Sequence, residues 1–535
     1  MRSSQYFTFS PLVLTLALAS CSRQAPLPLN PRIAVAEFDN QSTIADRWVR
    51  PLLSYAIIQQ LQAEKTMAAS LVNDAEGWRT LGVGRVISGH YRREGKGIRI
   101  HAALTDVAST GLLQEFDEVV EEAKLLEAST RLVSKLSGIK PSNLNFDFAQ
   151  WKGFAEAQVE GGPGALATFV ERNPGFALAY PILADMLVRS GKREEALALK
   201  NKFPVAADPL TRIQMDYALA PDAGAKLAAL EALSRMRQGD PRLLVELATL
   251  ASGQGRWDLA VAQYRELTKI EAGKVEWWNG LGYAEANQLH LPAAVAALNE
   301  YRKLAPNEPN VVDSLGEVNY MNRNFKEAAK SFDEQWQRFP TFQGGVGWRK
   351  AAFAYYYAGD LKTADLRYAD WRKQVLANLP PSGQAFQQAL WLARTGRAPQ
   401  ARTLLEQESA ESSGERKAIA GFHLAMLQFG LEGKVPAISS IQSWSQEIKD
   451  PQVRNEFSVF ALMAQPATNA DALKARIAAA IPQPQLAGLR NELMVAADIL
   501  SSPVKQEKPK LFPLPNTIDT PVDALLLRWR LAVIP

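Results

Sequence analysis

The chain has 535 residues, of which 47% are hydrophobic and 22% are charged, a composition typical of globular domains and not of disordered chains. Its 60 Lys and Arg residues nearly balance its 56 Asp and Glu residues and are interspersed with them, so no basic patch of the kind that binds nucleic acid is visible. The single Cys excludes an internal disulfide framework and a thiolate zinc site.

The first 20 residues have the pattern of an export signal. An apolar run over residues 11–19 is too short for a membrane-spanning helix but has the length of a signal-peptide core. The only Cys, Cys21, directly follows Leu18-Ala19-Ser20. This arrangement resembles the lipobox of bacterial lipoproteins, in which the Cys receives lipid. The alternative is an ordinary secretory signal with a chance Cys near its end.

The lipoprotein resemblance implies a signal peptide over residues 1–20, lipidation of Cys21 and a Pro-rich tether over residues 21–31. The residue after the Cys is Ser22. In the lipoprotein resemblance, an Asp at this position implies retention at the inner membrane, so Ser22 favours the outer membrane. No later segment contains 18 consecutive apolar residues, and we therefore expect the body of the protein to face the periplasm from a lipid anchor.

Residues 32–140 mix strand and helix patterns and are predicted to form a small α+β domain. Alternation along residues 97–105 places Ile98, Ile100, Ala102 and Leu104 on one face of a strand. Gly-containing turns separate this strand from its neighbours on both sides. The predicted strands cover 32–38, 66–72, 85–92, 97–105 and 111–119, and the predicted helices cover 44–62, 74–81 and 121–136.

Two segments of this domain, Ile33–Asn40 and Gly89–Asp106, resemble the TolB-amino-terminal-like domain in character and spacing. The resemblance covers residues 32–138 and implies a non-catalytic contact module. His90 and His101 fall on neighbouring predicted strands. Two His residues without carboxylates or Cys are more typical of ordinary sheet positions than of metal ligands.

Residues 141–500 are predicted to be helical and repetitive, with a period of 34 residues. The repeated positions are Trp278, Leu281, Gly282, Ala294, Leu298 and Pro306, followed 34 residues later by Val312, Leu315, Gly316, Ala328, Phe332 and Pro340. The pattern resembles the tetratricopeptide repeat (TPR), a pair of packed helices. Small residues such as Gly282 and Gly316 are expected where the two helices of a repeat cross at close range.

Weaker copies of the repeat flank this central region. They are predicted from about residues 177 and 345, with degenerate helix pairs at 382–413 and 416–447 and a helical lead-in over 141–176. A Pro-rich loop over 501–520 and a capping helix over 521–535 complete the chain. The predicted fold class is therefore mainly α, a TPR-like α-solenoid preceded by a small α+β domain.

The TPR resemblance implies that the first helix of each repeat lines a concave groove. Mapping the offsets that are not used for packing gives ten predicted groove residues, which we expect to bind a partner. They are Trp277, Asn279, Tyr283, Asn287, Asp313, Glu317, Tyr320, Phe353, Tyr356 and Tyr357. The alternative is that the aromatic members pack between repeats or against the first domain.

Motifs for catalysis are missing from the sequence, which contains no P-loop, no Gly-x-Ser-x-Gly elbow and no His-Glu-x-x-His pair. We therefore expect no enzyme activity, no cofactor and no metal, and predict a scaffold or assembly adaptor that binds an unidentified protein partner. A sensor or carrier that captures an envelope glycan or small ligand is the alternative function, and a cell-wall hydrolase is a third.

Overall fold

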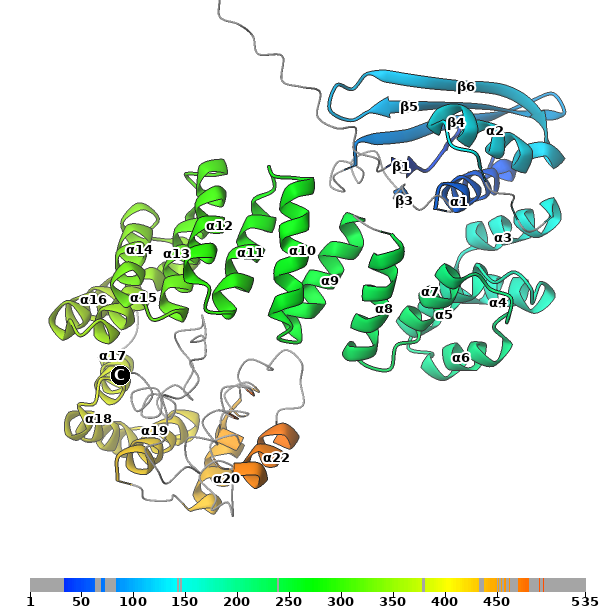
Figure 1. Cartoon of the computed structure of the whole chain (residues 1–535). Coiled ribbons are helices and arrows are strands. Elements are labelled where there is room, and N and C mark those ends of the chain that lie inside the picture. Colours follow the sequence, from blue (N-terminus) through cyan, green and yellow to red (C-terminus); the bar gives the residue numbers. More distant parts are fainter. Residues whose placement is uncertain are drawn as a thin grey trace, which may run out of the picture. The chain divides into compact units, whose positions relative to one another are not determined.

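The computed structural model describes residues 33–62, 69–72, 83–141, 147–237, 240–377, 381–432, 437–449 and 470–480, together with a few single residues (Figure 1). The chain divides into two compact units, residues 1–173 and residues 174–535. Cys21, the tether, the predicted helix over 74–81, the Pro-rich loop and the predicted capping helix lie outside the described residues.

The first unit is built on a mixed β-sheet with strand order β3-β1-β4-β5-β6, and β2 pairs with β4. β1 is parallel to both β3 and β4, whereas β4, β5 and β6 form consecutive antiparallel hairpins. The five predicted strands are thereby confirmed, with bounds β1 Ile33–Ala36, β3 Ala69–Val72, β4 Arg85–Glu94, β5 Gly97–Asp106 and β6 Leu112–Glu121. The short strand β2 (Asp39–Asn40) was not predicted.

Two helices, α1 (Val49–Gln62) and α2 (Leu125–Ser137), pack on the sheet. The alternation predicted for β5 is confirmed, because its four predicted inward side chains are at most 2% exposed. The two predicted helices begin later than expected, since a short 3-10 helix precedes each of them: η1 (Ile44–Asp46) and η3 (Glu122–Lys124). Buried Gln60 of α1 joins the two helices through a 3.1 Å hydrogen bond to Ser129 of α2.

A helical hairpin, α3 (Phe148–Glu160) and α4 (Gly162–Arg172), belongs to the first unit. Aromatic rings hold α3 against α1 and against Trp48, the residue before α1. The ring centres of Trp48 and Phe148 are 6.1 Å apart, and those of Tyr55 and Phe154 are 5.2 Å apart, both edge to face. The compact unit extends to residue 173 because the lead-in hairpin buries apolar side chains against α1.

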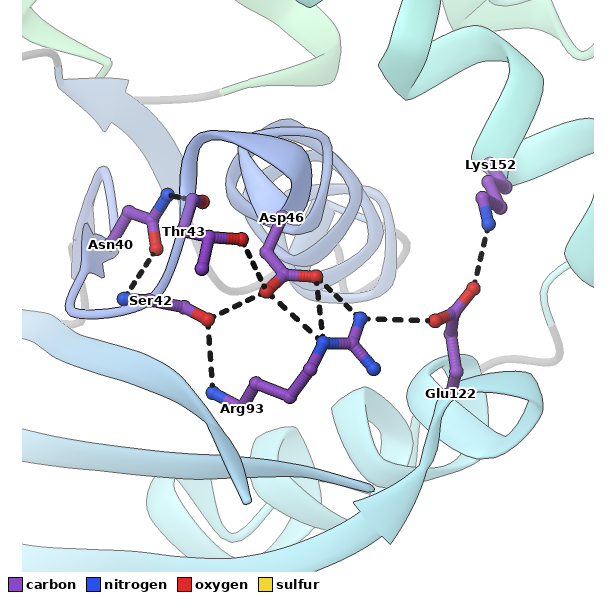
Figure 2. Close-up of polar contacts among 7 residues, drawn as sticks. All are labelled: Asn40, Ser42, Thr43, Asp46, Arg93, Glu122 and Lys152. Carbon is purple, nitrogen blue, oxygen red and sulfur yellow. Dashed lines mark hydrogen bonds and ion pairs between the residues drawn. The ribbon is translucent and has the colours of Figure 1, made fainter. Parts of the chain in front are cut away.

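A chain of ion pairs also links α3 to the sheet (Figure 2). Asp46 accepts two hydrogen bonds of 3.1 Å from Nε of Arg93, whose Nη2 donates to Asp46 and, at 3.2 Å, to Glu122. Glu122 in turn accepts a 2.6 Å bond from Nζ of Lys152 on α3. Ser42 and Thr43 also donate to Asp46. Four alternating charges thus connect η1, β4, η3 and α3.

The second unit is an array of helix pairs, and the 34-residue period is visible in the helix starts. Successive first helices begin at Pro241, Val275 and Pro309, and their second helices begin at Trp257, Leu291 and Phe325. Each step is 34 residues. These six helices are α9 Pro241–Gly253, α10 Trp257–Ile270, α11 Val275–Asn287, α12 Leu291–Leu304, α13 Pro309–Met321 and α14 Phe325–Arg338.

Further helix pairs flank these three repeats. Those predicted at about 177 and 345, and at 382–413 and 416–447, are confirmed as helical pairs. They are α5 Ala179–Arg189 with α6 Arg193–Ala198, α15 Val346–Tyr357 with α16 Leu361–Val375, α17 Pro381–Arg394 with α18 Ala398–Glu411, and α19 Gly414–Glu432 with α20 Ile438–Glu447. A short 3-10 helix, η4 Leu199–Lys202, follows α6, and α22 covers Ala470–Ala480.

The pair α7 (Pro209–Ala218) and α8 (Ala223–Met236) was not predicted from the sequence. Gln214 and Lys226 occupy the positions at which the next repeat has Ala248 and Ala260, so the small-residue signature is lost there. Helix-start signals were present, because Asp208 and Asp222 each accept a backbone hydrogen bond that caps the following helix.

The small residues of the repeats lie where their helices cross, as predicted. A Cβ added at Gly316 would stand 2.4 Å from Cε1 of Phe332, and one at Gly282 would stand 2.7 Å from Cγ of Leu298. Real Cβ contacts are never this short, so only Gly permits the observed approach of the two helices. The array is therefore a TPR-like repeat fold, preceded by a small mixed sheet with helices.

Candidate functional site

The ten predicted groove residues lie on the first helices α11, α13 and α15, and two pairs of them, Asn279 with Asp313 and Tyr283 with Glu317, are one period of 34 residues apart. Tyr283 and Glu317 are separated by one period, and the Tyr283 hydroxyl donates a short hydrogen bond to Oε2 of Glu317. Equivalent positions of successive repeats are therefore in direct contact. The stacking brings side chains 34 residues apart into one continuous row.

A buried charge network occupies the centre of this row. The ammonium of Lys350 on α15 lies 2.7 and 2.8 Å from the two carboxylate oxygens of Asp313 and 2.6 Å from Oε1 of Glu317, both on α13. Asp313 is 3% exposed, Glu317 8% and Lys350 6%. Because an ammonium has three hydrogens, these three bonds use its whole donor capacity.

Lys350 was not among the predicted groove residues. Lys350 itself carried no signal in the sequence, since a Lys on a predicted helix is usually solvated. Its role depends on the adjacent repeat, which supplies Asp313 and Glu317 four residues apart on one face of α13. The four-residue spacing of these two carboxylates was visible in the sequence. Two acidic residues on a buried helix face need a counter-charge, so their presence could have prompted a search for a nearby cation.

Burial dominates the electrostatics of the network. It raises the pKa of Asp313, an effect that the ammonium of Lys350 opposes. Burial, reinforced by the neighbouring carboxylate of Glu317, holds the pKa of Tyr283 well above its ordinary value. The phenol is therefore a neutral donor at physiological pH. The network joins three repeats and offers no free hydrogen of Lys350 to a ligand.

Aromatic side chains cluster next to the network. Tyr320 lies edge to face with Phe325 and with Tyr357, at ring-centre distances of 5.5 and 5.8 Å, and Tyr357 stacks on Phe325 at 5.2 Å. Phe353 packs edge to face on Trp391 of the following repeat at 5.3 Å. Tyr320 and Phe353 are only 3% and 5% exposed. These rings hold consecutive repeats together, as the alternative interpretation of the aromatic residues expected.

Side chains on α11 are less enclosed. Trp277, Asn279, Tyr283 and Asn287 are each partly exposed. The ammonium of Lys274 lies 5.7 Å from the ring centre of Trp277, within cation–π range. Oδ1 of Asn279 is buried and accepts no hydrogen bond from any described residue. Burying an unsatisfied amide oxygen of this kind costs free energy.

The structure thus separates the ten residues by accessibility. Four are buried and present little surface to a partner: Asp313, Glu317, Tyr320 and Phe353. Six are partly exposed: Trp277, Asn279, Tyr283, Asn287, Tyr356 and Tyr357. Whether these residues bind a partner stays a prediction.

The described part of the chain contains no group of three or more His, Cys, Asp or Glu side chains that could hold a metal ion. Among the same residues, no helix is both long enough and apolar enough to cross a membrane.

Comparison with known proteins gives no sequence match, since neither a protein-family model nor a curated protein matches this chain. Solved helical-repeat structures match at low similarity. MamA from Desulfovibrio magneticus is 15% identical over 38% of this chain and 97% of its own, with a TM-score of 0.27. A tetratricopeptide repeat protein from Parabacteroides merdae is 14% identical over 47% and 97%, with a TM-score of 0.31.

PilF from Pseudomonas aeruginosa is 13% identical over 41% of this chain and 96% of its own, with a TM-score of 0.27. Identities and scores at this level give no information on what this chain binds.

Proposed function

We propose that this protein is a non-catalytic interaction scaffold, lipid-anchored at a bacterial outer membrane and facing the periplasm, whose repeats bind a partner protein. One observation carries the proposal. Partly exposed aromatic and amide side chains of α11 and α15 lie on the two first helices that flank α13 and its buried charge network.

The chemistry of the accessible side chains defines the partner segment. Trp and Tyr bury a large area with only two side-chain torsions to freeze, and Asn can both donate to and accept from a peptide backbone. The six accessible residues are formally uncharged, and the buried carboxylates are already bound by Lys350. The proposal therefore favours an extended segment of mixed apolar and polar character over a strongly charged one.

Regular spacing supports binding of an extended segment. Tightly packed repeats form a preformed surface, so a partner meets side chains that are already in place and the entropy cost of ordering them is small.

Site-specific photocrosslinking in the native envelope tests the proposal. A photoreactive residue is placed at Trp277 or Tyr356 and, as matched controls, at the exposed positions Asn299 and Lys326 on the second helices α12 and α14. We expect protein adducts from the first two positions and none from the controls. Equal adducts at all four positions, or none at any, would contradict the proposal.

The same experiment distinguishes the scaffold from the alternative function, a glycan sensor or carrier. Aromatic and amide side chains also bind sugar rings, because a ring face stacks on the apolar side of a sugar and amides bond its hydroxyls. Adducts that contain carbohydrate and no second polypeptide would favour that alternative over the scaffold.

A further inference from the structure

A row of four polar side chains crosses the sheet of the first unit at a single register. His90 on β4 pairs with His101 on β5, and His101 pairs with Asp117 on β6. On the other side of His90, Asp39 on β2 is its partner. Cβ atoms of directly paired residues lie about 4.5–5.5 Å apart, so all four side chains are neighbours on one face. The sequence showed the two His residues but not these carboxylates beside them.

This row lies on the solvent-facing side of these strands. Tyr91, Ile100 and Phe116, which alternate with it, are at most 1% exposed and point to the core. His90 and His101 are partly exposed, whereas Asp39 and Asp117 are exposed. The neighbouring row contains Ser88 and Ala103, whose side chains are short.

The two imidazole rings have the separation that a shared metal ion requires. Their centres are 5.0 Å apart and their planes are inclined by 30°. A zinc ion about 2.0 Å from a ring nitrogen stands about 3.2 Å from that ring centre, so two imidazoles at a tetrahedral angle of about 109° have centres about 5.2 Å apart. Neither ring makes a hydrogen bond to any described residue, and rotation about χ2 is soft.

We propose that His90 and His101 bind a divalent transition metal ion such as Zn²⁺, with Asp39 as the third protein ligand and water in the remaining position. In the described part of the chain no three ligating groups converge as they stand, so Asp39 turns about χ1 to complete the site. Two imidazoles and one carboxylate are a ligand set suited to Zn²⁺ and its neighbours.

The surrounding charges favour Asp39 over Asp117 as the third metal ligand. Asp117 is held by Nη1 of Arg99 at 3.1 and 3.2 Å, whereas the Asp39 carboxylate has no partner among the described residues. Arg99 is also paired with Glu94, which reduces its repulsion of a cation. Arg92 in the same row as Arg99 is exposed, so water and salt screen its charge.

Calorimetric titration of the full-length chain with ZnCl₂ tests this site. Every protein carries Cys21→Ser, because a free thiol would bind zinc itself. His90→Gln and His101→Gln are compared with the control variants His290→Gln and His423→Gln, which remove the other two His residues of the chain. We expect one zinc ion per chain, affinity at least about tenfold weaker in each of the first two variants, and unchanged affinity in the controls.

Asp39→Asn should weaken binding in the same direction as the His variants. A second measurement needs no His variant and so does not depend on whether a variant folds. Cu²⁺ is paramagnetic and should broaden the imidazole NMR signals of only two of the four His residues. Absence of saturable zinc binding, equal affinity in His90→Gln and the parent chain, or broadening of all four His signals alike would overturn the proposal. The site lies in the first unit and does not depend on the function proposed for the repeats.

Discussion

Lys350 and Asp313 form a buried ion pair between the first helices of two neighbouring repeats, with Nζ 2.7 Å from Oδ1. Removing the cation leaves two buried carboxylates without a counter-charge. Lys350→Met is therefore expected to lower the free energy of unfolding by about 3 kcal/mol or more, measured by urea denaturation at pH 7. Adding Asp313→Asn to that variant should recover part of the loss, because one uncompensated charge disappears.

Lys303→Met is the matched control for this prediction. Lys303 pairs with Glu300 on α12, but its side chain is 70% exposed. Exposed pairs contribute at most about 1 kcal/mol. Equal losses in the two variants would show that the network around Lys350 is not a stabilising joint between repeats.

Close helix packing at Gly316 predicts that a larger residue there lowers the stability of the repeats. Gly316→Ala places a methyl group 2.4 Å from Cε1 of Phe332, so the second helix or the ring must move. We expect a loss of about 1–3 kcal/mol in the free energy of unfolding. Gly253→Ala is the control, because a Cβ there has nothing within 4 Å and α9 should be unchanged or slightly stabilised. A neutral Gly316→Ala would contradict the packing argument.

The ion pair between Asp46 and Arg93 should make the stability of the first unit depend on pH. Hydrogen bonds from Arg93 outweigh the opposing effect of burial and hold the pKa of Asp46 below its ordinary value. A depressed folded-state pKa stabilises the fold above the ordinary pKa, near pH 4, and that stability is lost as the pH falls through the folded value. Asp46→Asn should therefore cost about 2 kcal/mol at pH 7, and the difference from the parent chain should shrink toward pH 2.

Glu118→Gln provides the comparison for Asp46→Asn. Glu118 also pairs with an arginine, Arg131, but both side chains are exposed by more than a third. Its effect on urea unfolding, followed by circular dichroism from pH 2 to pH 7, should stay below about 1 kcal/mol. A pH-independent difference for Asp46→Asn would contradict the assignment of its lowered pKa to the ion pair.

Lipid attachment at Cys21 predicts a change of location. Two or three acyl chains hold a protein on a bilayer almost irreversibly, so Cys21→Ser should move it from the membrane fraction to the soluble periplasmic fraction. Fractionation in high salt, with immunodetection of both fractions, measures the shift. Continued membrane association of Cys21→Ser in high salt would contradict the anchor.

Local patterns predicted most elements because their causes are local. Alternation marked β5, whose inward residues are buried, and the 34-residue stride marked the helix pairs around α11 and α13. The pair α7–α8 was missed because Gln214 and Lys226 replace the small residues that made its neighbours recognisable. The packing of α3 on the first unit depends on contacts of Phe148 and Phe154 with Trp48 and Tyr55, which are distant in sequence.

The sequence by itself determined the type and spacing of the elements, because a period of 2 or of 34 residues states which side chains share a face. Only the tertiary structure decided which of those side chains meet. Strand register brought Asp39 next to His90, and repeat stacking brought Lys350 to Asp313 and Glu317. Both results depend on packing between elements, because packing sets the distances between side chains that form ion pairs or ligand sets. No local sequence pattern encodes those distances.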